Sequence, residues 1–262
     1  PFFDTVGPLA SIGILIDPFG DLWLTRTELS LLFVLAAGCI ICVFGAVLTV
    51  LPLVLVPQIR TSTGRTATSL YFACIGLGYL MLEITMLSRL THLIGDPVTA
   101  GAVTIAGFLF FSGLGSFTAR QTAAPETART DSPYLPASIV ARRLLLALVL
   151  VGAAELWSLE WTVVKMGQYG AYWRVVVAIA AIAPLGFLMG FPMPLGLRGL
   201  GSGAPHLVPW AWGVNGFASV LAPVLATAIA MTWGFRVAGS LALLFYAVAW
   251  LLPNRLPGAA RR

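Results

Sequence analysis

The segment Ser69–Leu93, with the sequence SLYFACIGLGYLMLEITMLSRLTHL, decides the fold class of this chain. Its only acidic or basic side chains, apart from a histidine, are Glu83 and Arg89. An α-helix rises about 1.5 Å per residue, so about 20 apolar residues cross the roughly 30 Å hydrocarbon core of a bilayer. The segment therefore predicts a transmembrane helix.

Similar apolar runs fill most of the chain. Hydrophobic residues make up 59% of the 262 residues, charged residues make up only 10%, and the mean hydropathy is +0.94. Soluble globular domains carry about 25% charged residues, so this composition excludes that class. We therefore predict an all-α integral membrane protein, a bundle of about seven transmembrane helices joined by short loops.

The apolar runs divide the chain into three parts. Residues 1–30 contain several aspartates and prolines and predict an interfacial entry segment, residues 31–253 a transmembrane domain, and residues 254–262 a basic tail. The predicted spans lie at about 31–56, 69–93, 98–117, 143–164, 172–195, 210–232 and 237–252.

The fifth predicted span, 172–195, contains Pro184, Pro192 and Pro194 among glycines. Proline removes a backbone donor and disrupts a helix interior. The prolines therefore either break the helix, so that freed backbone groups line a cavity as in transporters, or simply end it. The glycine-rich stretch 199–209 that follows predicts a loop.

The formal net charge is +5 and the pI is about 9.5. The basic residues are scattered between apolar runs and form no patch, which excludes a nucleic-acid partner. Their distribution instead predicts topology, because cytoplasmic loops are enriched in Lys and Arg. Ten of the 15 lie on the side of the C-terminus, so we expect the C-terminus in the cytoplasm and the N-terminus outside.

Three polar side chains stand out inside the predicted spans: Glu83, Glu155 and Asn215. An ionised side chain at mid-bilayer costs about 2.5–3.5 kcal/mol on insertion scales, so such residues mark candidate sites. Together they form a candidate intramembrane polar site for a proton or a cation. The alternative is that Glu83 and Glu155 are neutral groups that fix helix packing, and that Asn215 is an interhelical hydrogen-bonding residue.

Small residues allow helices to approach closely in a membrane, where little hydrophobic force drives them together. Gly186 and Gly190 form a GxxxG pattern in the fifth span, and Gly213 and Gly216 lie on the sixth. We predict that these glycines mediate helix packing.

The chain carries no recognisable catalytic motif. Cys39 and Cys42 form a CxxC at helical spacing inside an apolar run, which favours packing over redox chemistry. No pair of histidines is placed to hold a haem, and no P-loop, GxSxG or HExxH pattern is present. We therefore predict no catalytic residue, no cofactor and no metal in this chain.

Several motifs carry a family resemblance. In order they are 71–84 (YFACIGLGYLMLEI), 95–97 (GDP), 111–116 (FSGLGS), 184–198 (PLGFLMGFPMPLGLR) and 210–221 (WAWGVNGFASVL). The chain resembles the C-terminal transmembrane region of bacterial membrane-bound spermidine-synthase-like proteins. The resemblance implies the bacterial inner membrane. It also implies an upstream domain resembling S-adenosylmethionine-dependent aminopropyltransferases or methyltransferases, whose glycine loop and catalytic aspartates have no counterpart here.

Three functions remain open on this basis. The first is a non-catalytic anchor or accessory subunit of a larger membrane protein or complex, for example a respiratory or photosynthetic one. The second is a transport module for a small solute such as a polyamine, suggested by the three polar residues. The third is the membrane half of a spermidine-synthase-like enzyme. The expected partners are the lipid bilayer and other membrane subunits.

Overall fold

The computed structural model describes residues 26–55, 62–122 and 137–257, and within them all the regular secondary structure is helical. The long helices are α2 (Arg26–Leu55), α4 (Arg65–Ile94), α5 (Pro97–Thr122), α6 (Ala137–Met166), α7 (Ala171–Met189), α9 (Val208–Trp233) and α10 (Phe235–Leu251). The shorter elements are α8 (Pro192–Gly203) and the 3-10 turns η2 (Pro205–Leu207) and η3 (Pro253–Arg255). The predicted all-α class is confirmed.

The predicted boundaries differ from the observed ones at the ends of the chain. Residues 1–25 of the expected entry segment and 258–262 of the expected basic tail lie outside the described residues. Arg26–Ser30, also assigned to the entry segment, already form the first turns of α2.

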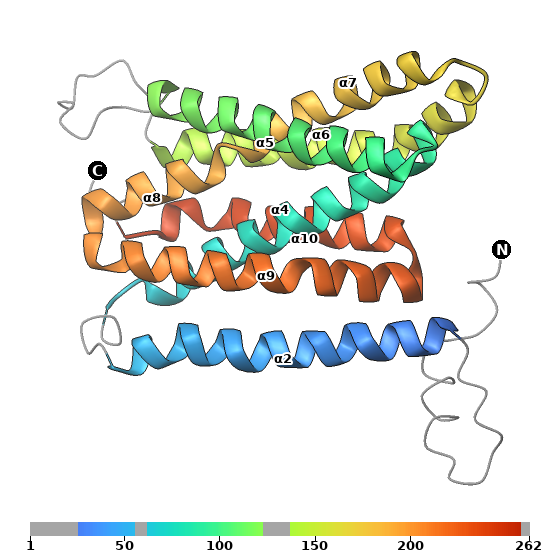
Figure 1. Cartoon of the computed structure of the whole chain (residues 1–262). Coiled ribbons are helices and arrows are strands. Elements are labelled where there is room, and N and C mark those ends of the chain that lie inside the picture. The colour runs from blue at the N-terminus through green and yellow to red at the C-terminus, as the bar shows by residue number, and fades with distance from the viewer. Residues whose placement is uncertain (1–25, 56–61, 123–136, 258–262) are drawn as a thin grey trace, which may run out of the picture.

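The long helices run side by side, and α4 crosses the middle of the bundle (Figure 1). It packs most extensively on α9 and α10 and also contacts α5, α6 and α7. Helix α2 lies at one edge of the bundle, against α9 (Figure 1). The core therefore centres on α4, whose buried side chains include Tyr71, Phe72, Leu82 and Met86.

Glycines bring α5 and α7 into backbone contact. A Cβ atom placed on Gly190 would collide with the carbonyl oxygen of Ser112, and one on Gly115 would collide with that of Phe187. At Gly186, the Cβ would lie 3.2 Å from that of Phe111. Only glycine permits such close approach, so these positions set the separation of the two helices.

The fifth predicted span is interrupted. Helix α7 contains Pro184 but continues to Met189, and α8 begins at Pro192 after the break at Gly190 and Phe191. Proline at the first position of a helix needs no backbone N–H, so Pro192 starts a new helix where the old one stops. The stretch 199–209, expected to be a loop, is helical: it comprises the end of α8, η2 and the start of α9.

Four helical segments are long and apolar enough to cross a membrane by length and composition: Arg65–Ile94, Pro97–Gln121, Ala171–Gly203 and Pro205–Trp233. Two further apolar helices, Leu32–Val47 and Phe235–Leu251, are shorter. These segments are counted among the described residues only.

Candidate functional site

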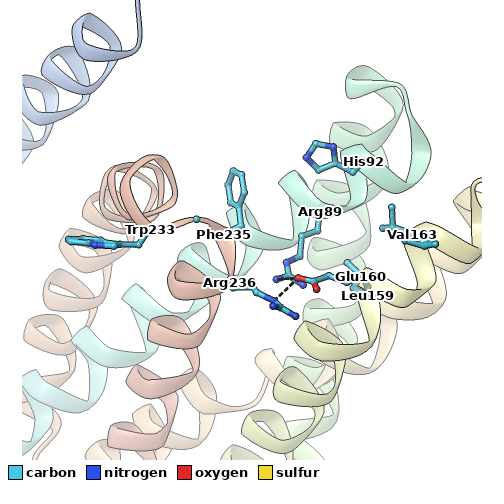
Figure 2. Close-up of a pocket in the computed structure, with 10 residues that line it drawn as sticks. Arg89, His92, Leu159, Glu160, Val163, Trp233, Phe235 and Arg236 are labelled. Atoms are coloured by element: carbon cyan, nitrogen blue, oxygen red, sulfur yellow. Dashed lines mark ion pairs between the residues drawn. The ribbon is translucent and has the colours of Figure 1, made fainter. Parts of the chain in front are cut away.

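The carboxylate of Glu160 links three helices. Its Oε1 atom lies 2.6 Å from Nε of Arg236 on α10 and 3.6 Å from a guanidinium nitrogen of Arg89 on α4, while Glu160 itself belongs to α6. Figure 2 shows both guanidinium groups approaching this carboxylate. The three residues form the Glu160 cluster.

The helix ends place these residues together. Helix α4 ends soon after Arg89, at Ile94, and Gly95 caps it: its amide donates to the carbonyl of Thr91, and its φ of 86° turns the chain out of the helix. Helix α10 begins one residue before Arg236, directly after Gly234. Helix α6 ends close by, so three charged residues from distant parts of the chain meet at one end of the bundle, the Glu160 end (Figure 1).

Arg89 is the buried member of the cluster. Its side chain is 9% exposed, against 46% for Glu160 and 59% for Arg236. It also donates a hydrogen bond of 2.7 Å to the backbone carbonyl of Leu156 on α6. A buried guanidinium requires such partners because its desolvation is costly.

Arg236 is held by a second contact. Its guanidinium lies 5.8 Å from the ring centre of Trp157, within the range of a cation–π interaction. Trp157 itself is largely exposed, as are Trp161, Tyr172, Trp173 and Trp233 at the same end of the bundle. Tryptophan and tyrosine are enriched where a membrane protein meets the headgroup region.

The Glu160 cluster forms one side of a cavity of about 510 Å³. Its other lining residues are His92, Leu159, Val163, Val164, Trp233, Gly234 and Phe235. Figure 2 shows His92 beside Arg89, with Phe235 and Trp233 on the side of α9 and α10. The cavity thus combines an apolar wall with two guanidinium groups that share one carboxylate.

The structure places the three polar residues of the spans in separate environments. The side-chain amide of Asn215 donates to the carbonyl of Phe72 at 3.1 Å, which ties α9 to α4. Glu155 on α6 has one buried carboxylate oxygen, Oε2, without a hydrogen-bond partner. Glu83 is partly buried on α4, three turns beyond Phe72. Within the described part of the chain, no two of these three side chains share a hydrogen bond or an ion pair.

The four glycines singled out for helix packing have different surroundings. Gly186 and Gly190 lie at the close contact of α7 with α5 described above. A Cβ on Gly213 would lie 3.9 Å from Cγ2 of Thr49, an ordinary van der Waals distance, and nothing lies within 4 Å of one on Gly216. Other glycines make tight contacts that involve α9 or α10, for example Gly76 with Asn215 and Gly239 with Leu156.

Sequence reasoning did not identify the Glu160 cluster. In the sequence, Glu160 lies between Trp157 and Trp161, and the predicted spans put Arg89, Glu160 and Arg236 near the same face of the membrane. The sequence therefore contained one indication of the cluster. Two arginines and a glutamate are expected at the same face of the membrane, where their helices end. The pattern could not show which helices are neighbours.

The described residues contain no group of three or more His, Cys, Asp or Glu side chains that could hold a metal ion. Cys39 and Cys42 are exposed free thiols on α2, and Cys74 is buried on α4. Comparison with protein families, with curated proteins and with solved structures finds no match for this chain.

Proposed function

We propose that this chain is a non-catalytic integral membrane bundle that acts as an anchor or accessory subunit of a larger membrane protein or complex. The observation that carries the proposal is the outer surface of the helices. Large apolar side chains are exposed on nearly every long helix, for example Phe33, Phe44, Phe110, Leu150, Ile179, Val220 and Leu244. So many exposed large apolar side chains suit lipid or another membrane protein, since soluble monomers rarely expose large apolar patches.

The interior supports a structural role. Three of its polar contacts join different helices: Asn215 to the carbonyl of Phe72, Tyr79 to Ser112 at 3.1 Å, and Tyr71 to the carbonyl of Pro192 at 2.8 Å. Interhelical hydrogen bonds of this kind stabilise membrane bundles. Because they are spread over separate helix contacts, they favour a packed scaffold over a transport pathway.

Helix α2 provides a surface for a neighbouring subunit. It packs mainly on α9, and Phe33, Ile40, Val43 and Phe44 are each more than half exposed. The resemblance to the membrane region of spermidine-synthase-like proteins fits the same role, because a bundle in such a protein would anchor a catalytic domain carried by another part of the protein.

The proposal is tested in two steps on membranes from cells that express the full chain. Alkaline carbonate should leave the chain in the pellet, as expected for an integral protein. Extraction in a mild detergent, followed by native electrophoresis, should then show it in a species well above 27.7 kDa plus its detergent. Release by carbonate would contradict the membrane assignment, and migration as a free monomer would contradict the accessory role.

A further inference from the structure

We propose that the cavity at the Glu160 end binds the phosphate group of an anionic phospholipid. The inference rests on one part of the proposed function, namely that the chain lies in a membrane, where phospholipids are available. It does not depend on the accessory role. The charge, the hydrogen-bond donors and the apolar walls of the cavity support it.

The cavity carries a net positive charge. The guanidinium groups of Arg89 and Arg236 carry two positive charges, whereas Glu160 supplies one negative charge. The Glu160 cluster thus retains one positive charge, which matches the single negative charge of a phosphodiester. Moreover, Arg89 is buried, so its charge is poorly screened by solvent and gains most from a further anion.

The Glu160 cluster has N–H donors that can bind such an anion. Arg236 uses Nε for Glu160, so its two terminal nitrogens are not required by that ion pair. A guanidinium presents five N–H donors in a planar fork that suits bidentate contact with phosphate oxygens. Arg89 uses one terminal nitrogen for Leu156 and the other for Glu160, which holds the cluster rigidly in place for the ligand.

The apolar walls of the cavity suit the acyl chains of a lipid. Val163, Val164, Trp233 and Phe235 line the cavity, and Val164 and Trp233 are 80% and 64% exposed. Acyl chains could therefore continue from the cavity along exposed apolar side chains. The exposed tryptophans and tyrosines at the same end are the residues expected at headgroup depth, where the phosphate of a lipid lies.

Native mass spectrometry of the purified full chain in detergent tests the proposal. The probes are phosphatidylglycerol, phosphatidylcholine and diacylglycerol with identical acyl chains. We expect phosphatidylglycerol to bind about tenfold more tightly than phosphatidylcholine, because only the former has net negative charge, and diacylglycerol to bind most weakly. Arg236→Gln should abolish the preference, whereas Arg236→Lys, which keeps the charge but not the fork, should retain part of it.

Lys165→Gln is the matched control, since it removes one exposed positive charge from the same end of α6 without touching the cavity. It should leave the preference unchanged. Equal binding of the three lipids, or equal weakening by Lys165→Gln and Arg236→Gln, would overturn the proposal. Displacement of phosphatidylglycerol by millimolar inorganic phosphate would support a phosphate site that also accepts the free anion, and no displacement would support the lipid as the ligand.

The lipid-binding test and the tests of the proposed function have independent outcomes. Binding in detergent does not depend on whether the chain forms part of a complex. Carbonate extraction, in turn, reports membrane insertion whatever the cavity binds.

Discussion

Arg89 of α4 pairs with Glu160 of α6, at 3.6 Å, and not with Glu83 on its own helix. Six residues separate Arg89 from Glu83, which places them about 9 Å apart along the axis and on different faces. Arg89 therefore faces α6 and α10. The pairing ties the C-terminal part of α4 to two helices that follow it much later in the chain.

The first prediction concerns Glu160. Glu160→Gln removes the anion shared by Arg89 and Arg236 and leaves the buried guanidinium without a counter-charge. We expect a loss of about 1–2 kcal/mol in the free energy of unfolding, less than for a fully buried pair because Glu160 is half exposed. Reversible unfolding in mixed micelles measures it. Lys165→Gln should change stability little, and equal effects of the two substitutions would contradict the structural role of the cluster.

The second prediction concerns the contact of α5 with α7. Gly190→Ala introduces a methyl group against the carbonyl of Ser112, so the helices must separate. We expect a loss of about 1–3 kcal/mol, as is usual for overpacking. Gly113→Ala on α5 is the control, because a Cβ there meets nothing within 4 Å. Similar melting temperatures for the two variants would mean that the helices do not touch at Gly190.

The third prediction concerns Asn215. Asn215→Ala removes the hydrogen bond to the carbonyl of Phe72 and should destabilise the bundle by about 0.6 kcal/mol, the mean for such bonds between membrane helices, and by no more than about 1.7 kcal/mol. Gly216→Ala alters the next residue, where there is open space, and should have no such cost. Unfolding of both variants under the same conditions provides the comparison. Wild-type stability of Asn215→Ala would show that this bond contributes nothing.

The fourth prediction concerns Asp96, in the turn between α4 and α5. Its Oδ2 atom accepts the backbone N–H of Thr99 at 2.8 Å, and hydrogen bonds from the side chain and backbone of Thr99 lower the pKa of this carboxyl. Because the folded pKa is below the unfolded one, the stabilisation is present above the ordinary pKa of about 3.9 and is lost as pH falls through the folded value.

Asp96→Asn removes this titration while keeping an amide that can cap α5. The difference in melting temperature between wild type and Asp96→Asn should be constant from pH 7 to about pH 5 and should then decrease in the acid range. A difference that does not change down to about pH 3 would show that the carboxylate is not stabilised in the folded state.

The helices themselves could be predicted from the sequence, because long apolar runs bounded by turns leave few alternatives. The predicted span 69–93 falls within α4, and 210–232 falls within α9. The stretch 199–209 could not be placed, since its glycines and prolines favour a loop locally. In the structure, Leu200 and Leu207 are fully buried, so packing stabilises helical backbone there against local preference.

The site was harder to predict for a physical reason. A helix that is apolar on all sides gives no sign of which face meets which neighbour. Asn215 could be singled out by its residue type alone, which left open a polar site or an interhelical hydrogen bond, and the structure shows its hydrogen bond to the carbonyl of Phe72. The Glu160 cluster depends on the contacts of α4 with α6 and α10, which no spacing along the chain reveals.

The central claim is that these helices cross a membrane, and labelling from the two sides tests it most directly. In a variant without Cys39, Cys42 and Cys74, single cysteines replace Gln168, in the turn before α7, or Ser202, near the end of α8. Both positions are exposed, and the apolar segment Ala171–Gly203 runs between them. We predict that an impermeant maleimide labels Gln168→Cys only from outside the cell and Ser202→Cys only in inside-out vesicles. Labelling of both positions from the same side would contradict the account.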